Sequence, residues 1–386
     1  MSVSRRSFVA TLGAGTAALA LPSITWRGHE GMLYAQGTQS RRADRLLAAR
    51  PGMIRIDSNE NPNGPGEHVF AAIRNDLAES NRYPVKGEDD LIAAIAAVHG
   101  IPVENIILGC GSGELLRVSV LAFTNAQRGL VVPDPTFESP ANFAKFMKAP
   151  VYGTKVDAKL QLDLDGMADA SRDNRPGLVY FCNPNNPTAT VHSASNVKAF
   201  IDRVGQQSPE TTILVDEAYH EYVDDKSYAT AIPIALANPR VVVTRTFSKV
   251  FGMAGLRVGY AIGQPTTLAR MQSWLLGSNV NQLALAAATT AVADTKHIAA
   301  ERGRNAETRA VTRKFFENAG YAVPACDANF MMIDIHRDVK LFKAECIKHN
   351  VAIGRQFPAL PTHARISIGT MTEMKKAFAV FKTTLA

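Results

Sequence analysis

The sequence contains few cysteines. Its 386 residues include four, at positions 110, 182, 326 and 346, and none of them shows Cys-x-x-Cys spacing. This pattern excludes a disulfide framework and a cysteine-based metal site. A bridge between Cys326 and Cys346 is conceivable in an exported protein, but buried free thiols are the favoured state. The nine histidines include no pair four residues apart on a helix, so we predict no metal site.

Runs of basic residues are also missing. The formal net charge is +7, but no basic run exceeds two residues and aromatic residues do not alternate with the basic ones. We therefore expect a solvated charged surface and no nucleic-acid partner. The hydrophobic content of 46% and the charged content of 20% are typical of a globular protein. The chain length favours about two domains.

The N-terminus resembles a twin-arginine export signal. Residues 4–9 read Ser-Arg-Arg-Ser-Phe-Val, and the apolar stretch at 9–21 is 13 residues long. A bilayer span needs about 20 residues, so this length fits the apolar core of a signal peptide. We place the signal at residues 1–35 and expect a periplasmic or extracytoplasmic protein that meets the membrane only through this signal. Cleavage after Ala35, cleavage near residues 18–20 and an uncleaved anchor all stay open, and a chance Arg-Arg pair is the alternative.

A lysine follows a predicted buried strand. Residues 241–244 read Val-Val-Val-Thr and lead into Thr-Phe-Ser-Lys, which ends at Lys249. Open α/β sheets bind ligands at this end of their strands. A lysine beside hydroxyl groups and glycines suits a Schiff base next to a phosphate, and Arg257 can bind that phosphate and lower the lysine pKa. A surface lysine in a glycine-rich loop is the alternative.

The stretch at 246–259, with Thr-Phe-Ser-Lys and Ala-Gly-Leu-Arg, resembles the lysine signature of fold-type I pyridoxal-phosphate aminotransferases, in the histidinol-phosphate aminotransferase branch. The resemblance covers roughly residues 50–380. It implies an α/β fold with a large domain, whose mostly parallel sheet is sandwiched by helices, and a smaller α+β domain. We expect a mobile polar arm and the start of the small domain at 36–75, the large domain at 76–281 and the small domain at 282–386.

A second segment predicts the cofactor's phosphate site. The strand expected at 106–108 runs into Gly-Cys-Gly-Ser-Gly and then into a helix. A helix start offers unpaired N–H groups and a positive dipole end to an anion. The family's Gly-Ser-Asp-Glu is Gly-Ser-Gly-Glu here, which backbone binding should tolerate. A tight turn without a ligand is the alternative. The resemblance implies that the phosphate is bound by Gly111, Ser112, Gly113, Thr246, Ser248 and Arg257.

The resemblance also assigns groups to the cofactor ring. Asp216 ends the strand expected at 212–216 and would pair with the pyridine nitrogen, keeping the ring cationic and electron-accepting. Tyr219 and Asn186 would bind the phenolic oxygen, and Phe137 would stack on the ring. Ala189 replaces the glycine of the family's Asn-Pro-Thr-Gly, which matters if this position needs a positive φ. A helix cap, turn residues and a core phenylalanine are the alternatives.

The resemblance also implies three residues that bind the substrate. Asn59 would lie near the substrate carboxylate, Arg365 would bind the α-carboxylate as a planar fork, and Arg355 would contact a distal anion. Tyr83 would reach the cofactor phosphate of a neighbouring subunit, which implies a homodimer with shared active sites. Surface arginines on an edge strand, and a tyrosine stacked on a proline turn, are the alternatives.

The resemblance implies an enzyme in which Lys249 holds pyridoxal 5'-phosphate as a Schiff base and then moves a proton, with Asp216 and Tyr219 assisting. It would transfer an amino group between an amino acid, or an amino-alcohol phosphate such as histidinol phosphate, and a 2-oxo acid. A decarboxylase or lyase on the same site is one alternative. A catalytically silent pyridoxal-phosphate-binding protein is another. The donor is left open, because histidine synthesis is cytoplasmic whereas the signal predicts export.

Overall fold

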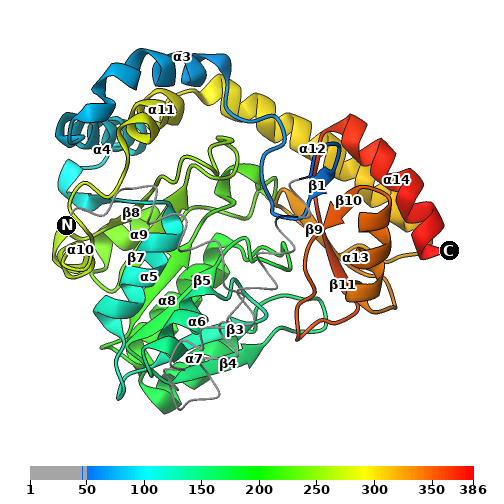
Figure 1. The fold of residues 1–386 in the computed structure, drawn as a ribbon. Helices are drawn as coiled ribbons and strands as arrows, with labels where there is room; N and C mark the ends of the chain where they lie inside the picture. Colours follow the sequence, from blue (N-terminus) through cyan, green and yellow to red (C-terminus); the bar gives the residue numbers. More distant parts are fainter. Residues whose placement is uncertain (1–45, 47–49) are drawn as a thin grey trace, which may run out of the picture. The chain divides into compact units, whose positions relative to one another are not determined.

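A seven-stranded sheet forms the centre of the larger part of the chain. The computed structural model describes residue 46 and residues 50–386, and residues 51–386 form one compact unit. The strand order is β2-β8-β7-β6-β5-β3-β4, and only β8 runs antiparallel to its neighbours (Figure 1). The strands are β2 (Ile106–Gly109), β3 (Leu130–Asp134), β4 (Val151–Lys155), β5 (Leu178–Cys182), β6 (Thr212–Asp216), β7 (Val241–Thr246) and β8 (Gly259–Gly263).

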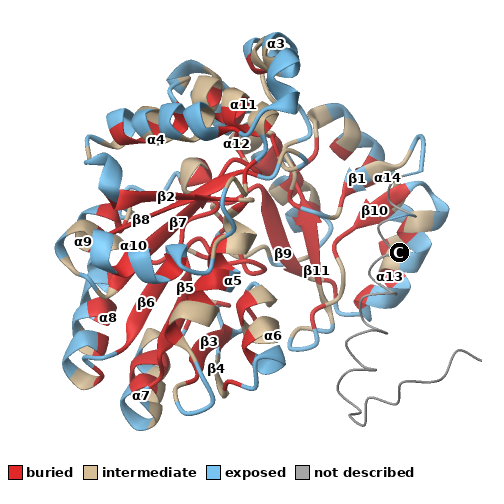
Figure 2. Ribbon diagram, turned by 60° about the vertical axis from the view of Figure 1, so that its left-hand side comes forward, coloured by how far each residue is buried: buried red, intermediate tan, exposed pale blue. Residues whose placement is uncertain are grey.

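Helices cover both faces of this sheet because its strands are apolar on both sides. On β5, Leu178 and Tyr180 pack into one apolar cluster and Val179 and Phe181 into another, as the alternation of side chains along a strand requires. Figure 2 shows these strands as the buried centre of the unit. Helices α5 (Ser112–Phe123), α6 (Ser139–Phe146) and α10 (Pro265–Gln272) cover one face, and α7 (Leu164–Asn174), α8 (Ala194–Gln207) and α9 (Ile232–Ala237) the other. The predicted α/β class with a mostly parallel sheet is confirmed.

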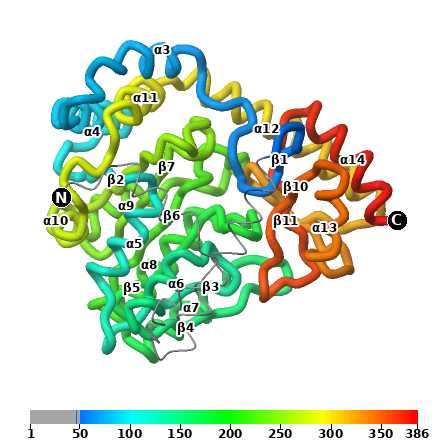
Figure 3. Tube along the Cα trace, in the orientation of Figure 1, coloured from blue at the N-terminus to red at the C-terminus, as the bar shows by residue number. Residues whose placement is uncertain are grey.

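Two small sheets lie beside this layered part. β1 (Ile54–Ile56) pairs parallel with β10 (Val351–Ile353), and β9 (Phe330–Asp334) pairs antiparallel with β11 (His363–Ser367). The chain trace in Figure 3 shows β1 returning to the C-terminal elements. Packed aromatic rings join the helices here, for example Phe315 on Phe378 with centroids 4.4 Å apart. The helices are α12 (Thr295–Asn318), α13 (Val339–Lys348) and α14 (Met371–Leu385).

Three more helices and three short 3-10 turns complete the described elements. α11 (Gln282–Val292) packs on α3 (Glu67–Asp76) and α4 (Val85–His99), which ends at Gly100 with φ of 63°. The sequence placed α11 in the small domain, and the predicted boundaries at 75 and 281 stay predictions. The turns are η1 (Leu77–Asn81), η2 (Val103–Asn105) and η3 (His220–Tyr222).

Two expectations from the sequence concern cysteines and membranes. All four cysteines are free thiols, and Cys326 and Cys346 are buried. Within the described residues, no helix is long and apolar enough to cross a bilayer. The expected export signal and the arm at 36–45 and 47–49 lie outside the described residues.

Candidate functional site

The carboxyl ends of β6 and β7 bring the predicted acid and the predicted lysine together. Asp216 is the last residue of β6 and is in register with Thr244 on β7. Lys249 follows three residues after β7 ends at Thr246. Parallel neighbouring strands end at the same sheet edge, so residues 33 positions apart become neighbours.

Asn59 holds the lysine in place from the opposite side of the site. Lys249 Nζ donates a hydrogen bond to the Asn59 carbonyl oxygen at 3.0 Å. Burial and the charges of Arg365 and Arg257 together lower the pKa of Lys249 to about 8, against the opposing effect of the Glu60 and Asp216 carboxylates. At pH 7 about a tenth of this amine is therefore neutral, and so nucleophilic, which is far more than for an ordinary lysine.

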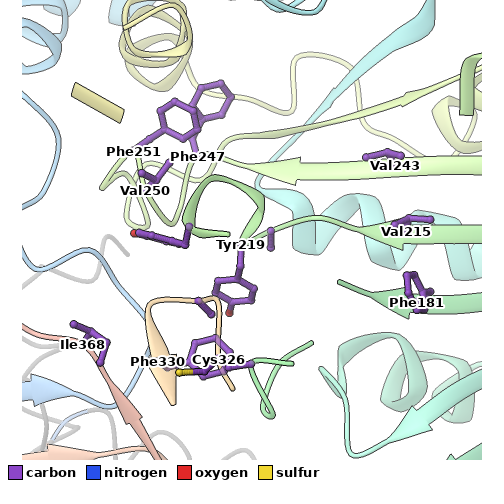
Figure 4. Close-up of a cluster of buried hydrophobic side chains, with 14 of the residues drawn as sticks. Phe181, Val215, Tyr219, Val243, Phe247, Val250, Phe251, Cys326, Phe330 and Ile368 are labelled. Carbon is purple, nitrogen blue, oxygen red and sulfur yellow. The ribbon is translucent and has the colours of Figure 1, made fainter. Parts of the chain in front are cut away.

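Tyr219 is placed by the same asparagine. Asn59 Nδ2 donates to the Tyr219 hydroxyl at 3.2 Å, and Lys249 Nζ lies 5.4 Å from the centroid of the Tyr219 ring. The ring packs edge-on against Phe330 with centroids 5.0 Å apart (Figure 4). The structure therefore brings Asn59, Tyr219 and Lys249 together as one group.

Asp216 has a hydrogen-bond partner that the sequence analysis did not identify. Tyr180 on β5 donates its hydroxyl to Asp216 Oδ2 at 2.8 Å, and the Ala218 N–H donates to Oδ1 at 3.2 Å. Burial raises the pKa of Asp216 to about 6, although these hydrogen bonds lower it. Burial also raises the pKa of Tyr180, so its hydroxyl remains a donor at neutral pH. The only sequence signal was a polar group on an otherwise apolar strand.

A cradle for an anion lies at the start of α5. Gly111 precedes the helix with φ of 76° and gives it no side-chain cap, so the first N–H groups of α5 have no partner within the helix. A Cβ at Gly259 would lie 2.5 Å from Ser112 N and 2.8 Å from the Arg245 carbonyl oxygen. Only glycine allows β8 to approach the helix start this closely.

The remaining phosphate residues of the prediction border this cradle. Arg257 Nη1 donates to Ser248 Oγ at 3.2 Å, and the Ser248 N–H donates to Thr246 Oγ1 at 3.1 Å. A Cβ on Gly111 would overlap the Arg257 guanidinium, so this cation lies directly against the glycine turn. A helix start, a guanidinium and hydroxyl groups together fit a phosphate group.

Arg365 provides a second, separate anion site. Its guanidinium donates to Asn186 Oδ1 at 2.8 Å and to the Asp57 carbonyl oxygen at 2.7 Å, while its buried Nε has no hydrogen-bond partner. Burial lowers the pKa of Arg365 to about 10, which leaves it charged at neutral pH. Among the described residues, no carboxylate forms an ion pair with it. A buried cation of this kind fits a ligand carboxylate.

Other predicted site residues lie in different surroundings. Arg355 is close to this second site and pairs with Glu138. Phe137 follows β3 and leaves 39% of its surface exposed, and Tyr83 is 88% exposed. Ala189 has φ of 60°, so the alanine that replaces the family's glycine is strained by about 1 kcal/mol.

The arrangement meets the chemical needs of pyridoxal phosphate. It offers an amine for the aldehyde, a buried carboxylate for the ring nitrogen and a phosphate cradle, with a guanidinium left for the substrate. The amine, the carboxylate and the phosphate cradle come from strand ends and loops at one sheet edge, whereas the guanidinium of Arg365 comes from β11. The individual roles of the residues stay predictions.

Comparisons with known proteins agree with this geometry. The family model described as "Aminotransferase class I and II" matches residues 51–381. A histidinol-phosphate aminotransferase of Symbiobacterium thermophilum is 31% identical over 86% of this chain and 91% of its own. An aromatic amino acid aminotransferase of Rhodococcus jostii is 34% identical over 86% and 90%. The structure of a Sinorhizobium meliloti histidinol-phosphate aminotransferase in complex with pyridoxal-5'-phosphate has a TM-score of 0.82 at 24% identity, covers 97% of this chain and 99% of that one, and shows the shared fold.

The raised pKa of Asp216 leads to a prediction about how the free energy of unfolding depends on pH. In the folded protein this pKa rises from 3.8 to about 6, so ionised Asp216 opposes folding. This destabilisation is absent below about pH 4, develops as the pH rises and is complete above the folded-state pKa, where it reaches about 3 kcal/mol. Asp216→Asn should therefore stabilise the cofactor-free protein in urea unfolding at pH 8, and the gain should shrink towards pH 4.

The exposed Asp202, which pairs with Lys198 on the surface, is the control for this measurement. Asp202→Asn should change the free energy of unfolding by no more than about 0.5 kcal/mol. A loss of stability in Asp216→Asn at pH 8 would show that the buried carboxylate is not a destabilising charge.

Proposed function

Because the chain belongs to the class I and II aminotransferases, we propose that its site moves the amino group of an amino acid, or of an amino-alcohol phosphate such as histidinol phosphate, to a 2-oxo acid. The cofactor of this enzyme is pyridoxal 5'-phosphate. The observation that carries the proposal is the partly buried Lys249, whose amine is influenced by the charges of Asp216, Arg257 and the buried Arg365. When bound, the cofactor supplies an aldehyde that condenses with amines and a ring that accepts the electrons of a broken Cα–H bond.

The chain's own groups then hold and orient the reactants. The α5 start and Arg257 would hold the phosphate, and Asp216, fixed by Tyr180, would supply the anion for the ring nitrogen. Arg365 binds the donor carboxylate as a fork, and its bond to Asn186 sets the orientation of that fork. Burial of these groups strengthens each charge interaction by excluding water.

Proton transfer is assigned to Lys249. Burial and neighbouring arginines lower the pKa of Lys249 to about 8. Its neutral amine can therefore accept the proton from the donor Cα and deliver it to the C4′ atom of the cofactor. The Asn59 carbonyl oxygen accepts a hydrogen bond from Nζ at 3.0 Å and thereby orients the amine. The Tyr219 hydroxyl, held by Asn59, would donate to the oxygen of the cofactor ring.

The donor half-reaction tests this function. Mixing the protein with amino acids should convert the bound cofactor to pyridoxamine phosphate, seen as loss of the cofactor's visible absorbance, with release of a 2-oxo acid. Lys249→Ala should lower the rate at least about 10³-fold, because it removes the general base. The exposed Lys226→Ala is the control and should leave the rate unchanged.

The products of the same assay separate the alternatives. Release of carbon dioxide without pyridoxamine phosphate would identify a decarboxylase. Binding of the cofactor without conversion by any donor would identify a silent binding protein. Either result would overturn the proposal.

We also propose that the enzyme is a homodimer with shared sites. Exposed apolar side chains gather within residues 70–85, where Leu77, Tyr83 and Val85 are 54%, 88% and 62% exposed, and burying such surface would stabilise an interface. Light scattering should give twice the mass of the chain, and Tyr83→Ala should weaken cofactor binding. A monomer that binds the cofactor tightly would refute this proposal.

We propose export by the twin-arginine route on the sequence of residues 4–21 alone. A reporter fused behind residues 1–35 should reach the periplasm of a bacterial host. Replacing Arg5 and Arg6 with lysine should keep it in the cytoplasm, whereas unchanged export of the double variant would contradict the proposal.

A further inference from the structure

A carboxylate lies opposite the second arginine of the substrate site. Glu138 Oε2 forms an ion pair with Arg355 Nη2 at 2.7 Å, and the side chains are 30% and 32% exposed. Arg355 Nη1 also donates to the Gln356 carbonyl oxygen at 3.1 Å. The pair therefore fixes the Arg355 guanidinium and largely offsets its charge.

Arg355 and Arg365 lie against the same aromatic ring. The two guanidinium carbons are 4.1 Å and 5.4 Å from the centroid of Phe357. The backbone enforces this closeness, because the Gly354 N–H donates to the Arg365 carbonyl oxygen at 3.0 Å. The charges of Arg355 and Glu138 both act on Arg365, in opposite directions. The three groups therefore form one electrostatic unit.

The loop that carries Glu138 is held by hydrogen bonds to Asn185. Thr136 donates its hydroxyl to Asn185 Oδ1 at 2.7 Å, and Asn185 Nδ2 donates to the Pro135 carbonyl oxygen at 3.1 Å. Asn185 directly precedes Asn186, which accepts from Arg365. Glu138 is therefore held near the substrate arginines by buried bonds, so a ligand cannot displace it without cost.

The net charge of Arg355, Arg365 and Glu138 bears on which donors can bind, α-amino acids or amino-alcohol phosphates. A carboxylate carries one negative charge, whereas a phosphate monoester carries about −1.5 to −2 at pH 7. Two free arginines would suit the phosphate. With Arg355 offset by Glu138, Arg365 alone remains, and one cation suits one carboxylate.

We propose that Glu138 is a specificity-determining residue that selects α-amino acids over amino-alcohol phosphates as donors. It does so by occupying Arg355, so that a phosphate placed there meets a like charge. This proposal rests on the aminotransferase function above and narrows its substrate class.

The test uses two ligands that cannot react because they lack the amine. They are 3-(imidazol-4-yl)propanoate and 3-(imidazol-4-yl)propyl phosphate, the deamino forms of histidine and histidinol phosphate. Calorimetry on the holoenzyme gives both dissociation constants. In Glu138→Gln, affinity for the phosphate ligand should rise roughly tenfold relative to the carboxylate ligand, since one partly exposed like charge is removed.

A second variant and a control separate this effect from misfolding. The double variant Glu138→Gln/Arg355→Gln should lose the increase in relative affinity for the phosphate ligand, because in this proposal the Arg355 guanidinium binds the phosphate once Glu138 no longer offsets its charge. Glu210 pairs with Arg240 at 3.2 Å near the opposite, amino end of β6, so Glu210→Gln should leave the ratio of the two constants unchanged.

Donor half-reactions with L-histidine and L-histidinol phosphate, followed by cofactor absorbance, should show the same shift in ratio. An unchanged ratio in Glu138→Gln, or tighter binding of the phosphate ligand by the unaltered protein, overturns the role of Glu138 even if transamination is intact. Absence of any donor half-reaction, with the calorimetric shift present, overturns the function and leaves the electrostatic selection standing.

Discussion

The site depends on the buried Asn59. It adopts φ of 54°, accepts from Lys249 through its carbonyl oxygen and donates to Tyr219 through its amide. Ser367 binds both its side chain and its backbone N–H, and Asn329 Nδ2 donates to the same carbonyl oxygen at 2.9 Å. A buried polar group must satisfy its hydrogen bonds, and here those bonds join the N-terminal segment, two strand ends and β11 in one arrangement.

A second buried network steadies the strands beneath this site. Arg245 on β7 forms an ion pair with Glu217 at 2.7 Å, and both side chains are almost fully buried. Thr230 donates to the same carboxylate at 2.8 Å. Glu217 and Arg245 are chain neighbours of Asp216 and Thr246. Breaking one half of such a pair would leave an unpaired buried charge, so the pair holds the ends of β6 and β7 together and thereby fixes Asp216 relative to Lys249.

The two candidate anion sites differ in the groups that they offer: the first relies mainly on backbone N–H groups at the start of α5, and the second on the side chain of Arg365. The helix start at Gly111 offers N–H groups that can bind a phosphate through the backbone, so the replacement of the family's sequence by Gly-Ser-Gly-Glu is compatible with such a site. The second site relies on Arg365, whose charge is adjusted by Arg355 and Glu138. In this proposal the fold supplies a backbone site for the cofactor phosphate, whereas the choice of donor depends on the side chains of Arg365, Arg355 and Glu138.

The sequence by itself determined the strands, the glycine turns and the order of the predicted site residues. The apolar, β-branched runs that end before Asp216 and Lys249 are visible in the sequence, so the α/β class and the sheet edge could be predicted. Only the tertiary structure placed Tyr180 under Asp216, Arg365 against Asn186 and Glu138 on Arg355. These partners are 36, 179 and 217 residues apart. Local patterns in a chain report the neighbours of a residue along one strand or helix, whereas such pairs form only after distant segments have packed.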